Sequence, residues 1–268
     1  MSEQRVTLNI DDGIAFVTLN RPEKRNALDM AMFKAIDSVS RQLRRDRRIR
    51  AVIVRGDGED FCSGLDVKSV LSEKSSAMSL LAKWWPGQAN LAQRVSVNWR
   101  RIPVPVIMGI QGRCWGGGLQ IALGADFRFA ATDSSLSIME GKWGLIPDMG
   151  ANLALRELVS KDAALKMAIT AEVISAQDAL EIGLITGLSD DPLRQAMDLA
   201  KAVTERSPDA VAGVKKLYQN TWFRAEWLML ARESYYQARI LLGKNQGRAV
   251  KRQMAPEKNT PYTDRKRW

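Results

Sequence analysis

The sequence predicts an α/β protein with a helical last third. Through the first two thirds, short apolar runs typical of strands alternate with segments of helical periodicity. From about residue 150 onwards nearly every segment has a helical pattern, with breaks at Gly183, Gly187, 190–192 and 207–208. Alternating strands and helices favour a mostly parallel sheet that helices cover. The 268 residues, 46% of them hydrophobic, suffice for one large domain, or for one domain with a helical appendage.

The first expected elements are a hairpin and a helix. Residues 5–10 and 14–20 alternate apolar and polar side chains around the sequence DDG, which is typical of a β-hairpin. A basic loop, RPEKRNAL, comes next. Residues 29–46 then have helical spacing, and Asp29 stands where an N-terminal helix cap is expected.

Two mostly apolar runs, 51–56 and 104–110, predict strands that are buried on both faces. A glycine-containing loop follows each of them. Between the two strands, residues 67–101 predict helices with a break at Pro86 and Gly87. After the second strand we expect a helix over 119–124 and short strands over 125–130 and 135–139.

Three consecutive glycines, Gly116, Gly117 and Gly118, separate the second strand from its helix. Such a run carries an entropic cost, so it indicates either very tight packing or a ligand close to the backbone. A dinucleotide fingerprint fits poorly because its spaced glycines and later acidic residue are missing, and no phosphate-loop lysine follows. Free N–H groups at a helix start can stabilise a carbonyl oxygen that gains charge, by roughly 3 kcal/mol per donor. The loop at Gly64 and Leu65 has the same character.

The composition excludes several classes of protein. The chain has no histidine, which excludes Ser–His and Cys–His catalysis and histidine metal sites. Two cysteines, Cys62 and Cys114, argue against a structural zinc site and fit a reducing compartment. No apolar run reaches the ~18–20 residues of a membrane span, and the N-terminus lacks an apolar signal core. We therefore expect a cytoplasmic protein without a membrane partner or a bound metal.

The net charge of +10 is concentrated in part in residues 41–50 and in the closing RKRW. Basic runs can bind nucleic acid or the phosphates of a ligand. The alternative is a solvated helix face and a tail over 251–268 that is partly loose, which we favour for each run taken alone. No aromatic side chains alternate with the arginines, as stacking on single strands would require.

Four stretches, taken in order, resemble the crotonase family of enoyl-CoA hydratases and isomerases. They are LNRPEKRNALD, DFCSGLDVKS, GRCWGGGLQIALGADFRFA and LSIMEGKWGLIPDMGANLAL. The resemblance implies a spiral of ββα units followed by helices that build trimers. It divides the chain into a catalytic spiral over 1–190, a helical trimerisation region over 191–250 and the basic tail. The implied assembly is a homotrimer or a hexamer made of two trimers.

The resemblance also implies a binding site for an acyl-CoA thioester. Its oxyanion hole corresponds to the backbone N–H groups of Leu65 and Gly117. The coenzyme, which enters as the substrate thioester and not as a cofactor, is implied to bind near residues 21–25 and near Lys68. The expected contacts on the coenzyme are Lys24, Arg25, Ala27 and Lys68; the alternative for each lysine or arginine is an exposed, solubilising charge.

The carboxylates bear on which reaction is expected. By resemblance, hydratases of the family use two glutamates, and Gln120 stands at the first of these positions while Glu140 matches the second. Glutamine exchanges no proton at neutral pH, so Gln120 is expected to line the pocket. Asp148 stands eight residues after Glu140, as in dienoyl-CoA isomerases. The alternatives are a surface glutamate at a helix start for Glu140 and a turn or helix cap for Asp148.

Three functions follow as hypotheses. The leading one is a double-bond isomerase that moves a proton through Glu140 while the oxyanion hole stabilises an enolate. The second is a hydratase or another crotonase activity in which Glu140 acts and Gln120 only orients water. The third, which we rank last, is a nucleic-acid-binding homologue. Trp84, Trp85 and Trp143 are expected either to wall the acyl pocket or to pack in the core.

Overall fold

The computed structural model describes residues 4–71, 74–258 and 260–268. The strands are β1 (Val6–Asp11), β2 (Ile14–Leu19), β3 (Ala51–Gly56), β4 (Val106–Ile110), β5 (Arg113–Trp115), β6 (Phe127–Ala130), β7 (Ser135–Ser137), β8 (Ile174–Ser175) and β9 (Gly187–Leu188). The α-helices are α1 (Met30–Arg45), α2 (Val67–Leu71), α3 (Lys74–Leu81), α4 (Leu91–Arg101), α5 (Gly117–Ala122), α6 (Asn152–Leu158), α7 (Lys161–Thr170), α8 (Ala176–Glu181), α9 (Pro192–Thr204), α10 (Pro208–Thr221), α11 (Glu226–Leu241) and α12 (Lys244–Met254). Short 3-10 helices are η1 (Pro22–Lys24), η2 (Met139–Trp143) and η3 (Pro256–Lys258).

A six-stranded sheet in the order β1-β2-β3-β4-β6-β9 forms the centre of the molecule. The expected hairpin of β1 and β2 is confirmed, and the other neighbours in this sheet pair in parallel. Asp12 and Gly13 both have positive φ, as a tight hairpin turn requires. The expected α/β class is therefore confirmed, with a helical region after it.

Three short strands were missed by the sequence reading. β5, β7 and β8 form a second, three-stranded sheet, and β9 closes the edge of the first. Strands β5, β8 and β9 are only two or three residues long, so they carry no periodicity that a sequence could display. The helix after the triple glycine also begins two residues earlier than expected, at Gly117, because glycine is a poor helix former that nevertheless suits a first turn.

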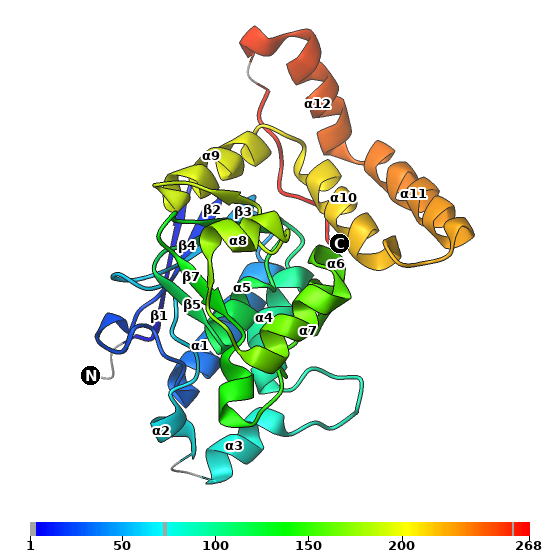
Figure 1. Cartoon of the computed structure of the whole chain (residues 1–268). Coiled ribbons are helices and arrows are strands. Elements are labelled where there is room, and N and C mark those ends of the chain that lie inside the picture. The colour runs from blue at the N-terminus through cyan, green and yellow to red at the C-terminus, as the bar shows by residue number, and fades with distance from the viewer. Residues whose placement is uncertain (1–3, 72–73, 259) are drawn as a thin grey trace.

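Helices cover both faces of the six-stranded sheet (Figure 1). On one face, Val52 and Val54 of β3 belong to a large apolar core with α1, α4 and α5. On the other face, Ile53 of β3 packs with α9. The expected cap of α1 is confirmed, because the Asp29 carboxylate accepts a hydrogen bond of 2.7 Å from the Met32 N–H.

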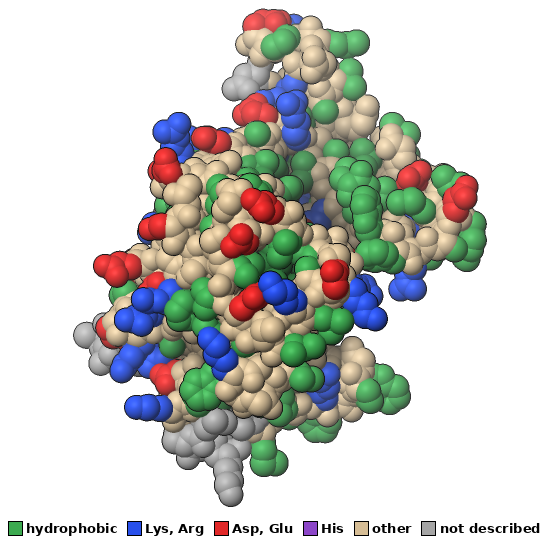
Figure 2. Space-filling view, viewed as in Figure 1, with side chains coloured by type: hydrophobic (Ala, Val, Ile, Leu, Met, Phe, Trp, Pro, Cys, Tyr) green, Lys and Arg blue, Asp and Glu red, His purple; other side chains and the backbone are tan. Residues whose placement is uncertain are grey.

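Helices α11 and α12, together with residues 222–225 that lead into them, extend from this body as an arm that α10 connects to it (Figure 1). The arm carries large apolar side chains that are exposed in the single chain, and Figure 2 shows them gathered over it. They include Trp222, Phe223, Trp227, Leu230, Leu241 and Leu242. Among the described residues, no helix has both the length and the apolar character to cross a membrane.

The expectation of a partly loose basic tail is wrong for its last residues, which return to the body of the protein. Arg265 is 2% exposed, and its guanidinium donates a hydrogen bond of 2.7 Å to the Asp46 carbonyl. The Lys266 N–H donates to Asp209 at 2.5 Å, and the Trp268 ring meets Tyr236 edge-on at 5.7 Å. The tail is ordered because its backbone and side chains find partners that the sequence does not place beside it.

The arginine run after α1 supplies several of these partners. Arg47 donates to the Arg265 carbonyl at 2.7 Å, and Arg50 donates to the carbonyls of Thr204 and Arg206 at 2.9 and 2.6 Å. These two arginines therefore tie the α1 end to the helical region and to the tail. The expectation of a solvated face is wrong for Arg50, which is half-buried, whereas Arg47 stays exposed while it makes this contact.

Replacing Arg265 with methionine is expected to lower the free energy of unfolding by about 1–3 kcal/mol, because a buried, charged donor is lost from the Asp46 carbonyl. Urea denaturation measures the change. Arg267→Met is the matched control, since the Arg267 side chain is exposed. Equal stabilities for the two variants would contradict a structural function for the tail.

Candidate functional site

Two strand-to-helix turns touch each other at the centre of the candidate site. A methyl group built on Gly118 would lie 2.4 Å from the Cys62 carbonyl oxygen, and one on Gly64 would lie 3.0 Å from that of Trp115. Gly64 and Gly116 also have φ of +97° and +51°, which side chains rarely adopt. The tight-packing interpretation of the triple glycine is therefore confirmed.

The same contact brings two amide groups together. A methyl group on Gly64 would lie 3.5 Å from the Gly117 nitrogen, so the turn before Leu65 lies against the start of α5. Within the part of the chain that the structure describes, neither the Leu65 N–H nor the Gly117 N–H donates a hydrogen bond. Two free amides of neighbouring turns can donate to one oxygen atom.

Glu140 lies beside these turns, on η2. Its Oε1 would be 3.6 Å from a methyl group on Gly116, and it accepts a hydrogen bond of 2.6 Å from Gln120 Nε2. Its Oε2 is buried and has no hydrogen-bond partner among the described residues. Burial raises the pKa of Glu140, and repulsion from Asp148 adds to the rise. Hydrogen bonds from the backbone amide of Glu140 and from Gln120 oppose it. The alternative of a surface glutamate is wrong.

Asp148 follows on the loop between η2 and α6. It does not cap a helix, because α6 begins at Asn152 with Ala151 at its cap position, so the helix-cap alternative is wrong. The side chain is exposed, yet enough protein surrounds the carboxylate to raise its pKa by desolvation. Asp148 also adds a small repulsion that raises the pKa of Glu140.

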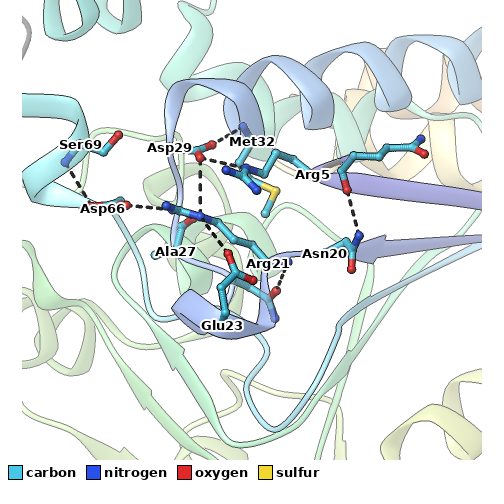
Figure 3. A network of polar contacts seen from close by, with 11 residues as sticks. Arg5, Asn20, Arg21, Glu23, Ala27, Asp29, Met32, Asp66 and Ser69 are labelled. Atoms are coloured by element: carbon cyan, nitrogen blue, oxygen red, sulfur yellow. Dashed lines mark hydrogen bonds and ion pairs between the residues drawn. The ribbon is translucent and has the colours of Figure 1, made fainter. Parts of the chain in front are cut away.

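A network of polar contacts joins the first loop, 21–29, to the loop that carries Leu65 (Figure 3). Arg21 is 8% exposed and donates to the Ala27 carbonyl at 3.0 Å and to the Asp66 carboxylate at 2.9 Å. Burial acts to raise the pKa of Asp66, but the Ser69 N–H and Arg21 outweigh it and lower that pKa. Arg21 thus faces inward and braces the two loops.

The expected coenzyme contacts lie on these braced loops. Lys24, Arg25 and Lys68 are exposed, and Lys24 is close enough to Asp66 to lower its pKa. The Arg25 guanidinium lies 3.8 Å from Asp60, so part of its charge is already paired. Ala27 is half-buried. Both loops therefore carry exposed cations, and neither lysine forms an ion pair with another described residue.

The three tryptophans differ from one of the two expectations. Trp84, Trp85 and Trp143 are 99%, 70% and 62% exposed. Core packing is therefore wrong for all three, because their positions on a loop before α4 and on η2 leave the rings at the surface. Their contact with an acyl chain stays a prediction.

The chain is similar to known proteins over most of its length. Residues 9–254 match the family model described as enoyl-CoA hydratase/isomerase. The chain belongs to the enoyl-CoA hydratase/isomerase family. A probable enoyl-CoA hydratase of Bacillus subtilis is 30% identical over 225 residues, which cover 82% of this chain and 84% of that protein.

Relatives of both reaction types are similar to this family member. A mitochondrial Delta(3,5)-Delta(2,4)-dienoyl-CoA isomerase of Mus musculus is 30% identical over 75% of this chain and 64% of its own length. Among solved structures, an enoyl-CoA hydratase of Mycobacterium smegmatis superimposes with a TM-score of 0.83 at 25% identity, covering 97% of this chain and 99% of that one. The family and its fold are thus shown, whereas the reaction is shared between hydratases and isomerases.

Two features of this hydratase/isomerase family member were missed in the sequence. Arg21 and Asp66 stand within the motifs that carried the resemblance, but their ion pair joins positions 45 residues apart. The Met149 N–H, which donates to Gln120 Oε1 at 2.9 Å, has no side-chain signal at all. The opposite charges of Arg21 and Asp66 were the only sequence signal for this ion pair. A basic loop predicts a phosphate contact equally well.

Replacing Gly118 with alanine is expected to lower the free energy of unfolding by at least about 2 kcal/mol, because its methyl group would press on the Cys62 carbonyl. Gly247→Ala is the control. A methyl group there meets nothing within 4 Å on α12, so stability should rise by roughly 0.5–1 kcal/mol. Thermal unfolding of both variants measures the difference, and a stable Gly118→Ala protein would contradict the packing of the two turns.

Proposed function

We propose that this protein isomerises the double bond of an enoyl- or dienoyl-CoA thioester. The observation that carries the proposal is the half-buried Glu140, whose Oε2 is buried and has no hydrogen-bond partner among the described residues, next to the Leu65 and Gly117 amides, which donate to none of those residues. The family supplies the substrate class, a thioester of coenzyme A. Glu140 would be the proton carrier and the amides of Leu65 and Gly117 the oxyanion hole.

The chemistry follows from these positions. Two N–H donors on the thioester oxygen would stabilise the enolate that forms when a proton leaves the carbon chain. The Glu140 carboxylate would accept that proton and return it to a more distant carbon, which shifts the double bond. Its raised pKa makes it a stronger base than an exposed glutamate. The proton is removed and returned, so the reaction has no net oxidation and requires no redox cofactor.

Asp148 is proposed as the second acid for dienoyl substrates. Its pKa is raised, and it lies close enough to Glu140 to repel it. Two carboxyl groups near one acyl chain could serve carbons at different distances from the thioester. Lys24, Arg25, Ala27 and Lys68 would bind the coenzyme on the braced loops, and the exposed tryptophans would contact the acyl chain.

Hydration of a 2-enoyl-CoA is the second candidate, because relatives such as the (E)-benzylidenesuccinyl-CoA hydratase of Thauera aromatica, 33% identical over 76% of this chain, carry that name. In that reaction Glu140 would activate or protonate water, with Gln120 only orienting it. Isomerisation is favoured, since Gln120 cannot supply the second acid of a two-carboxylate hydration.

Glu140→Gln is expected to lower kcat for 3-enoyl- and 3,5-dienoyl-CoA by about 10²–10⁴-fold, since the proton carrier is lost. The wild-type rate should fall as the pH drops through the raised pKa of Glu140, because only the ionised form accepts a proton. The low-pH fall of the pH–rate profile should therefore lie at higher pH than the pKa of an exposed glutamate would give. Following the absorbance of the conjugated thioester measures isomerisation. Unchanged turnover in the variant, or fast hydration of 2-enoyl-CoA without isomerisation, would contradict the proposal.

We also propose that the arm of α11 and α12 joins chains into a homotrimer, or into a hexamer of two trimers. Its exposed tryptophan, phenylalanine and leucine side chains are of the kind that stable interfaces bury. Sedimentation velocity should give a trimer or hexamer for the wild type and smaller species for Leu230→Glu. Gln237→Glu, also exposed on α11, serves as the control for added charge. A monomeric wild type would contradict the assembly.

A further inference from the structure

We propose that Gln120 is a positioning residue that holds Glu140 with a single oxygen free and thereby prevents positions 120 and 140 from sharing a catalytic water. The inference rests on the proposed function of Glu140. It assigns to Gln120 a task beyond lining a pocket: the amide fixes which oxygen of the acid can carry a proton.

The orientation of the Gln120 amide is set from its far side. The Met149 N–H can only donate, and it lies 2.9 Å from Gln120 Oε1, so that end of the amide is the oxygen. The opposite end, Nε2, therefore points at Glu140 and donates to Oε1 at 2.6 Å. A backbone amide, a glutamine and a glutamate form one directed chain of hydrogen bonds.

This chain has an electrostatic consequence. A donor that faces a carboxylate stabilises its ionised form, so the Gln120 amide lowers the pKa of Glu140 against the effect of burial. Gln120 therefore limits how far burial raises the pKa of Glu140. Without Gln120, only the backbone amide of Glu140 would still oppose the effect of burial on this pKa.

The chain also has a geometric consequence. Oε1 accepts the Gln120 hydrogen bond, so Oε2, which is buried without a hydrogen-bond partner among the described residues, is the oxygen left to take up a proton. Gln120 itself is fully buried. A water bridging both side chains would need two hydrogen bonds of about 2.8 Å each in place of the single 2.6 Å contact. The direct contact leaves no place for a water shared between positions 120 and 140.

Two substitutions test the inference. Gln120→Met keeps the approximate size and removes the donor, whereas Gln120→Glu keeps an acceptor for the Met149 N–H and turns the donor into a second carboxylate. Gln195→Met is the matched control, because this glutamine is half-buried on α9, which packs against the other face of the sheet. Circular dichroism establishes that each variant is folded.

The readout is the titration of Glu140 in protein labelled with ¹³C at glutamate side-chain carboxyls, without substrate. The signal that disappears in Glu140→Gln identifies the residue. In Gln120→Met the midpoint should move to higher pH, since a donor to the ionised form is gone. In Gln120→Glu it should also move up, and the two carboxyls should titrate as a coupled pair. Gln195→Met should leave the midpoint unchanged.

Kinetics supply the second readout. With the free oxygen no longer fixed, kcat of Gln120→Met for the isomerisation should fall on the order of 10²-fold with little change in KM. The acid limb of its pH profile should move in the same direction as the NMR midpoint. A purely structural role would move neither the midpoint nor the limb.

A Glu140 midpoint that is the same in wild type and in a folded Gln120 variant would overturn the inference. If Gln120→Met does not fold, Gln120→Glu decides alone. Failure of the wild type to turn over enoyl or dienoyl thioesters would instead contradict the proposed function. The titration needs no substrate, so the two failures are distinguishable.

Discussion

The contact between two backbone turns sets the geometry on which the rest of the site depends. The start of α5 and the turn at Gly64 approach so closely that a single added methyl group on Gly118 would fall within 2.4 Å of a carbonyl oxygen. Only glycine allows backbones to meet in this way. The contact places the Leu65 and Gly117 amides, from turns that follow strands of two different sheets, at one site. Arg21 and Asp66 then hold the first loop to the second, so the surfaces proposed for the coenzyme are carried by the same rigid unit.

Beside these two turns the protein partly buries the carboxylate of Glu140, which is unfavourable for its ionised form. Glu140 has a buried oxygen without a partner among the described residues, and its pKa in the folded chain is raised. A folded-state pKa above the unfolded value means that the folded chain binds this proton more tightly. Its contribution to stability is thus present at low pH and is lost as the pH rises through the folded pKa. An acid kept under such conditions is typical of functional sites, where stability is given up for reactivity.

Several arginines of this basic protein stabilise its fold by donating hydrogen bonds to main-chain carbonyls. The arginine run after α1 looks like a polyanion-binding surface in the sequence, yet Arg47 and Arg50 donate to main-chain carbonyls of the tail and the helical region. Arg265 closes the arrangement from the other side. A guanidinium suits this task because it remains charged and offers several donors in one plane. The helical arm thereby has a fixed base, while its apolar side chains stay available for other chains.

The sequence by itself determined the elements that local chemistry specifies. The hairpin at Asp12 and Gly13, the Asp29 cap and the two buried strands all follow from periodicity and turn residues within a few positions. The resemblance in four motifs indicated the family and pointed to Glu140. The tertiary structure alone decided what depends on distant partners: the strands β5, β8 and β9, the buried tail, and the contact of Arg21 with Asp66. It also decided that Gln120 is held by a backbone amide at Met149 and faces Glu140 with its nitrogen. Every residue except proline has the same backbone N–H. The sequence therefore cannot predict which backbone N–H will orient the Gln120 amide.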